Sequence, residues 1–311
     1  MLNYAMRAAS FVFLTLGAHA FASPSSVLNG AIKHARATPI VPNGPAIYAR
    51  KSVRSTVVVD NAALMLRGGF VSSVVIPRDP TVAFIGLIGA SLWLKIWTSL
   101  ASAGQVDPKI SRKIVHTGSA PLFLLTWPFF SDLASAQYVA ATVPLIFALR
   151  LVLARIGKEA DLVKAISRSG HALEALGGPF IYCLVLLAFT LVGWRTAPVV
   201  VALVQMAVGD GLADIIGRKY GTKKWPWSST KSIAGSVAFA LGGLAASVGL
   251  FVWFGACGCT LPGRLAALSL PDLCVSMAMV SLASAAVELM PFGDDNVNVP
   301  FAALLFTNLL N

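Results

Sequence analysis

The sequence predicts an all-α, polytopic transmembrane bundle of about seven to eight spans. Only 12% of its 311 residues are charged, against about 25% in soluble domains. The mean hydropathy is +0.77. Apolar runs near 20 residues recur along the chain, and that is the length of helix that crosses a bilayer.

The N-terminal part is predicted to be a two-part targeting sequence. Residues 1–20 read as a signal peptide, with Arg7, an apolar stretch over 11–16 and a cleavage site at 18–20. Residues 21–73 are rich in Ser, Ala and Arg and nearly free of acids, as in a transit peptide. The pair resembles the presequences of plastids with extra membranes. A plain secretory signal followed by a disordered tail is the alternative.

Residues 74–311 are predicted to form one membrane-embedded domain. The expected spans are roughly 81–104, 114–130, 134–154, 172–194, 196–216, 232–256, 273–290 and 299–311. The loops then alternate between two sides. Twelve Lys/Arg fall on one side, whereas the other has Arg195 and Arg264, which is the positive-inside pattern. The basic side should face the stroma or cytosol. Lys95 lies within a span, either lining a cavity or marking a misplaced boundary.

The net charge of +11 does not indicate a nucleic-acid partner. Roughly half of the excess lies in the N-terminal segment, where Asp60 is the first acid. The remaining excess follows the loops.

The segment Gly209-Asp210-Gly211-Leu212-Ala213-Asp214 ends the fifth span. Asp210 and Asp214 share a helix face at a spacing of four, and paired carboxylates are ligands that Mg²⁺ accepts. Gly209 and Gly211 give the backbone room to bend or to approach a ligand. These residues predict a metal–nucleotide site. The alternative is that Asp214 only pairs with Arg218 at the helix end.

The basic loop 217–231 follows, and Lys231-Ser232 opens the sixth span. Hydroxyl residues and free N–H groups at a helix start favour phosphate. The loop lacks the P-loop pattern. Arg218, Lys231 and Ser232 are therefore candidate phosphate-binding residues in a site of another kind.

Two further clusters fall on the basic side. Arg112, Lys113 and His116 share one face at the start of the second span. Arg112 and Lys113 are candidate nucleotide-binding residues, and His116 could act as a base or donate to a phosphate; interfacial anchoring is the alternative. Glu288 lies near a span end, where an acid is costly. Asp295, in an Asp-Asp-Asn run, is a third candidate metal ligand or part of a polar turn.

The chain resembles phytol kinases, within the wider family of CTP-dependent polyprenol and dolichol kinases. The matching stretches are Arg112 to His116, the segment 174–179, Gly209 to Arg218, Lys231 to Ser236, and Glu288 to Pro300. Gly177 and Met290 depart modestly from the expected pattern. The C-terminal signature of the related cytidylyltransferases is missing.

The resemblance implies phosphorylation of a prenyl alcohol, phytol to phytyl phosphate, in a plastid membrane. CTP or another nucleoside triphosphate would be the donor, and the product would feed tocopherol and phylloquinone synthesis. Asp210, Asp214, Lys231, His116 and Glu288 are the candidate catalytic residues, with either His116 or Glu288 as the base. Farnesol, geranylgeraniol or dolichol are alternative substrates, and a membrane transporter is the alternative class.

Overall fold

The computed structural model describes residues 56–57, 76–158 and 176–311. Outside these ranges lie the predicted signal peptide (1–20), nearly all of the predicted transit-peptide segment (21–73), and Glu174. Two short antiparallel strands, β1 (Thr56–Val57) and β2 (Ile76–Pro77), precede the helices. The helices are α2 (Arg78–Ser102), α3 (Pro108–Thr126), η2 (Trp127–Phe129), α4 (Ala136–Arg155), α6 (Gly178–Val192), α7 (Ala197–Val204), η4 (Gln205–Gly209), α8 (Asp210–Tyr220), α9 (Ile233–Ala256), η5 (Arg264–Ala267), α10 (Leu270–Glu288) and α11 (Asp295–Leu310).

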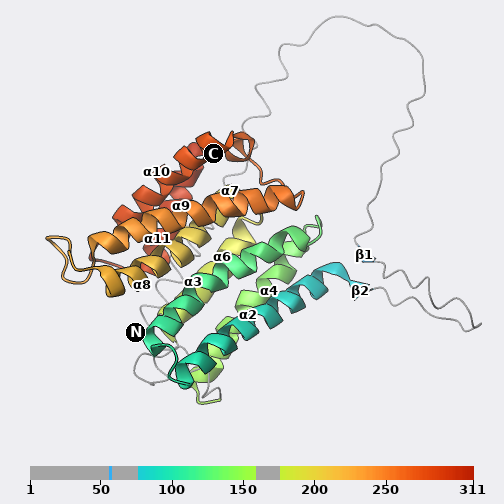
Figure 1. The fold of residues 1–311 in the computed structure, drawn as a ribbon. Coiled ribbons are helices and arrows are strands. Elements are labelled where there is room, and N and C mark those ends of the chain that lie inside the picture. Colours follow the sequence, from blue (N-terminus) through green and yellow to red (C-terminus); the bar gives the residue numbers. More distant parts are fainter. Residues whose placement is uncertain (1–55, 58–75, 159–175) are drawn as a thin grey trace, which may run out of the picture.

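The predicted fold class is confirmed: the described part of the chain is a bundle of helices (Figure 1). Five helical segments in it are long and apolar enough to cross a membrane: Arg78–Ser102, Ala136–Arg155, Ala197–Tyr220, Ile233–Ala256 and Leu270–Glu288. Helix α6 is apolar but shorter. Each predicted apolar stretch contains a helix, while the count of seven to eight spans stays a prediction.

Several helices begin or end away from the predicted limits because polar caps extend them. Asp107 accepts a hydrogen bond from the Lys109 backbone N–H, so α3 begins before its apolar run. Asp294 caps α11 in the same way. A capping side chain satisfies N–H groups that the first helical turn leaves without partners. Apolar runs alone therefore placed these helix starts several residues too late.

Helix α7 lies at the centre of the bundle. All eight of its residues are buried, and it packs against α11 and α9. It continues through the π-helical turn η4 into α8, so this continuous segment leads from the core to Asp210. Helix α2, by contrast, forms an outer edge (Figure 1), with only 6% of its apolar window buried. Lys95 is exposed on α2.

Contacts between loop residues occur at both ends of the bundle. At one end, Arg195 before α7 bonds Asp132 before α4 (2.9 Å), and the backbone N–H of Arg264 donates to Asn311 at the C-terminus. At the other end, Lys231 before α9 reaches both Glu288 of α10 and Asp295 of α11. The candidate residues thus meet at the basic end.

Candidate active site

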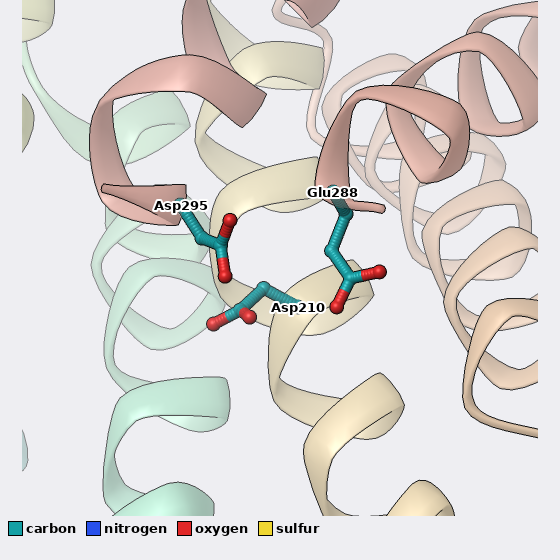
Figure 2. Close-up of side chains that lie close together, drawn as sticks. All are labelled: Asp210, Glu288 and Asp295. Atoms are coloured by element: carbon teal, nitrogen blue, oxygen red, sulfur yellow. The ribbon is translucent and has the colours of Figure 1, made fainter. Parts of the chain in front are cut away.

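Three acidic side chains from three helices meet at the basic end of the bundle. Asp210 begins α8, Glu288 ends α10 and Asp295 begins α11. One carboxylate oxygen from each lies within 4.8 Å of the others, and Figure 2 shows the carboxylates converging. Asp210 and Glu288 are 6% and 4% exposed. Buried carboxylates at such distances repel one another unless cations compensate them.

Two lysines far apart in the sequence supply part of that compensation. Lys113 Nζ lies 2.9 Å from Asp210 Oδ2. Lys231 Nζ donates to Glu288 Oε1 (2.6 Å) and to Asp295 Oδ2 (3.0 Å). Three carboxylates and two ammonium groups leave one negative charge when the nearby His116 is neutral. Carboxylate oxygens around residual negative charge suit a hard divalent cation such as Mg²⁺.

The two groups of this cluster that lie outside the membrane-spanning segments have shifted pKa values. Burial acts to lower the pKa of Lys231, but its hydrogen bond to Glu288 and the charges of Asp295 and Glu288 outweigh burial and raise it. Burial raises the pKa of Asp295; Lys231 opposes this and the charge of Asp210 adds to it. Lys231 therefore stays positively charged at neutral pH.

His116 lies beside Asp210 on α3. Its Nε2 is 3.3 Å from Asp210 Oδ2 and 3.3 Å from the Met206 carbonyl oxygen. Both neighbours accept hydrogen bonds, so Nε2 carries a hydrogen. In the neutral ring, Nδ1 is then the nitrogen that can accept a proton.

Tyr182, which the sequence analysis did not single out, holds this part of α3. Its hydroxyl donates to the His116 carbonyl (3.0 Å) and accepts from the Ala120 N–H (2.9 Å). These two backbone groups are four residues apart, so the hydroxyl is inserted where a helical hydrogen bond would normally form. Its ring also lies 4.5 Å from the His116 ring, centroid to centroid. The only sequence signal for Tyr182 was a hydroxyl within an apolar run.

The π-helical turn Gln205–Gly209 sets the direction from which Asp210 enters the site. A π turn adds a residue to the helical repeat and is frequent at functional sites. Gln205 is fully buried, and its Nε2 donates to Ser281 (2.7 Å) on α10 and Ser247 (3.2 Å) on α9. These bonds tie the helix that carries Asp210 to the helix that carries Glu288. An amide inside an apolar run could have marked Gln205 in the sequence.

Gly209 and Gly211 serve helix packing. A Cβ on Gly209 would lie 2.7 Å from the Phe239 ring on α9, and a Cβ on Gly211 would overlap Thr117 on α3. The two glycines let α9 and α3 approach α8 on either side of Asp210. The structure thus gives both glycines close contacts with neighbouring helices, and their contact with a nucleotide stays a prediction.

Asp214 lies apart from the three-carboxylate cluster. Its Oδ1 accepts from Arg218 Nε at 2.8 Å, an i,i+4 pair in which the Arg218 side chain is 53% exposed. This is the arrangement that the sequence analysis held as its alternative. The acids that cluster with Asp210 are Glu288 and Asp295, from other helices, and spacing within one helix could not reveal them. A metal role for Asp214 stays a prediction.

Two cavities meet at the Lys113–Asp210 pair. A polar cavity of about 580 Å³ lies on one side, and both cluster lysines, Arg218, Lys224, Asp214 and Ser232 line it with the three acids. Ser232 also caps α9 by accepting from the Gly235 N–H. An apolar cavity of about 200 Å³ lies on the other side. Arg112, Lys113, His116, Tyr182 and Asp210 line its polar end, and α2, α3, α4 and α6 supply its apolar walls.

The arrangement can place a charged, phosphate-bearing group and an apolar group on opposite sides of one ion pair. The polar cavity holds cationic side chains at several positions, together with three carboxylates whose grouping suits a divalent cation. The apolar cavity ends at His116 and Asp210, so a polar head on an apolar ligand would reach the same ion pair.

Comparison with known proteins finds relatives that match most of the chain. The chain is 36% identical over 265 residues to "Phytol kinase 1, chloroplastic" of Arabidopsis thaliana, covering 83% of this chain and 81% of that protein. It is also 36% identical to "Probable phytol kinase, chloroplastic" of Zea mays, over 75% of this chain and 77% of that protein. No family model and no solved structure matches the chain.

Proposed function

This chain belongs to the phytol kinase family, and from that premise we propose that it transfers the terminal phosphoryl group of a nucleoside triphosphate to phytol. The observation that carries this proposal is the Lys113–Asp210 pair, which lines both cavities. A prenyl chain in the apolar cavity presents its hydroxyl to this pair. A nucleotide in the polar cavity presents its phosphate from the other side.

The polar cavity matches the charge of a triphosphate. Lys113, Lys231, Lys224 and Arg218 line it, and phosphoryl transfer depends mainly on positioning and on stabilising negative charge. CTP is our proposed donor, on the strength of the resemblance to CTP-dependent polyprenol kinases.

Asp210, Glu288 and Asp295 are the residues that would hold Mg²⁺. The bound ion supplies positive charge to the phosphate oxygens during transfer. Lys231 contacts Glu288 and Asp295, so it can neutralise these acids in the absence of the ion. Asp214 remains a candidate from the sequence, with a lesser role beside Arg218.

In the reaction, the alcohol oxygen forms a bond to the γ-phosphorus while the bond from this phosphorus to the nucleoside diphosphate oxygen breaks. The hydroxyl proton passes to a base. His116 is our choice, because it lines the apolar cavity and Asp210 fixes its Nε2–H, leaving Nδ1 to accept the proton. Glu288 lines the polar cavity and bonds Lys231, an arrangement better suited to charge balance.

We place the enzyme in a plastid membrane with the basic end toward the stroma. The relatives named above are called chloroplastic, and the apolar helices suit a bilayer. Phytyl phosphate would then supply tocopherol and phylloquinone synthesis. A transporter would be expected to hold its ionisable residues near mid-bilayer, whereas Glu288 ends α10 and Asp295 begins α11.

The test is a transfer assay on the full chain in lipid nanodiscs. Phytol is incubated with γ-labelled CTP, ATP, GTP or UTP, and labelled phytyl phosphate is measured after extraction. We expect label in the lipid fraction, with CTP giving the highest kcat/KM. Transfer of label to water alone, or to no lipid with any nucleotide, would refute the assignment; a preference for another nucleotide would refute only the choice of CTP.

A further inference from the structure

The depth of the apolar cavity can be estimated from the lining residues on each of three helices. On α3 the lining runs from Arg112 to Phe123, and His116, the proposed base at the polar end, lies seven residues before Phe123; on α6 the lining runs from Gly178 to Leu186. On α4 it runs from Leu151 to Val143. These separations of seven or eight residues correspond to about 10–12 Å at the helical rise of about 1.5 Å per residue.

The inner end of the cavity is closed by aromatic side chains. Phe123, at that end, packs edge-on against Trp127 with ring centroids 5.8 Å apart. Trp127 is fully buried and lies 4.7 Å from Trp194, centroid to centroid. A ligand chain therefore cannot continue along the bundle axis beyond Phe123 without displacing a packed aromatic core.

A phytyl chain is longer than this depth. Its main chain of 16 carbons spans roughly 19 Å when extended, at about 1.25 Å of advance for each C–C bond of 1.5 Å. The cavity can then hold about half of the chain, corresponding to the first two isoprenoid units. The distal half has to leave the cavity sideways.

One wall of the apolar cavity is formed by α2. Helix α2 is the outer edge of the bundle and buries little of its surface. It contributes Ala90 and Leu94 to the cavity wall. The neighbouring Leu92 on the same helix is 53% exposed, as expected for a side chain that faces lipid.

We propose that this cavity recognises only the hydroxyl-proximal two isoprenoid units of its alcohol and leaves the rest of the chain in the bilayer beside α2. The inference rests on the proposed kinase function and deepens it. Its consequence is a substrate class: allylic and reduced prenyl alcohols of ten carbons or more, with little discrimination by total chain length.

The first test compares prenyl alcohols of 5, 10, 15 and 20 carbons in nanodiscs at equal measured mole fraction in the lipid. We expect kcat/KM values within about threefold for the three longer alcohols. The 5-carbon alcohol should be at least about tenfold poorer, because half of the cavity stays unfilled. A steep rise from 10 to 20 carbons would overturn the proposal. Phosphorylation of none of these alcohols, nor of phytol, would instead refute the proposed function.

The second test fills the cavity wall. Ala90→Trp should lower kcat/KM at least about tenfold for the 10- and 20-carbon alcohols alike, whereas Leu92→Trp, on the lipid-facing side of the same helix, should stay near wild type. Ala90→Leu provides a milder variant if Ala90→Trp folds poorly by size-exclusion chromatography. Unchanged activity of folded Ala90 variants, or a loss confined to the 20-carbon alcohol, would contradict the proposal.

Discussion

The two aspartates of the Gly-Asp-Gly segment should differ sharply when each is changed to asparagine. Asp210 contacts Lys113 and His116 and lies in the three-carboxylate cluster. On the proposed mechanism, Asp210→Asn therefore removes a charge that serves both the ion site and the base. We expect kcat to fall by about 10²–10⁴-fold, the range for losing acid–base or charge-stabilising groups.

Asp214→Asn removes a partly exposed i,i+4 pair with Arg218. Such pairs contribute about 0.3–0.5 kcal/mol, which corresponds to a factor of about two in a rate or equilibrium constant. Asp214→Asn should therefore retain at least about one third of the wild-type kcat. The assay is transfer from γ-labelled CTP to phytol in nanodiscs at saturating substrates.

Folding has to be separated from catalysis in this comparison. Asp210→Asn leaves Lys113, whose side chain is 16% exposed, without its carboxylate partner, which can cost stability. The double variant Lys113→Met with Asp210→Asn removes both charges and should recover thermal stability without recovering activity. Equal losses of kcat in Asp210→Asn and Asp214→Asn would show that both aspartates serve the ion, as their spacing on one helix first suggested.

Four further outcomes are expected. Gln205→Leu should lower the free energy of unfolding by about 1–3 kcal/mol, because buried hydroxyls lose their partner; a denaturation series in detergent measures this. Gly211→Val should reduce folded yield by overlapping α3, whereas Gly249→Ala, where a Cβ meets nothing within 4 Å, should not. Tyr182→Phe should lower kcat about tenfold and change the pH profile, because the helix around the base loses its inserted hydroxyl; Tyr138→Phe on an exposed position is its control. Chelation by EDTA should abolish transfer, and added Mg²⁺ but not K⁺ should restore it.

Much of the fold could be predicted because its causes are local. The lengths of the apolar runs located the helices. The distribution of Lys and Arg among the loops predicted that Asp210, Glu288 and Asp295 lie at one end of the bundle. The direct contacts among these acids could not be predicted, since they depend on which helices become neighbours. The π-helical turn was also invisible to periodicity: one extra residue at 205–209 rotates everything after it by about 100°. A single continuous helical wheel over 197–220 therefore misplaces either α7 or Asp210.

On the proposed mechanism, the apolar walls of the cavity that would hold the alcohol have a consequence for use of the nucleotide. Water is a smaller acceptor than any alcohol and is far more abundant, so a kinase has to keep it from the γ-phosphorus. Only the polar end of the cavity offers hydrogen-bond partners to an isolated water, and that water would lack the fixed position that an alcohol gains from its chain between the apolar walls. On the proposed mechanism, the same side chains that accept the prenyl chain also suppress futile hydrolysis of the donor, so nucleotide turnover should follow the supply of alcohol in the bilayer.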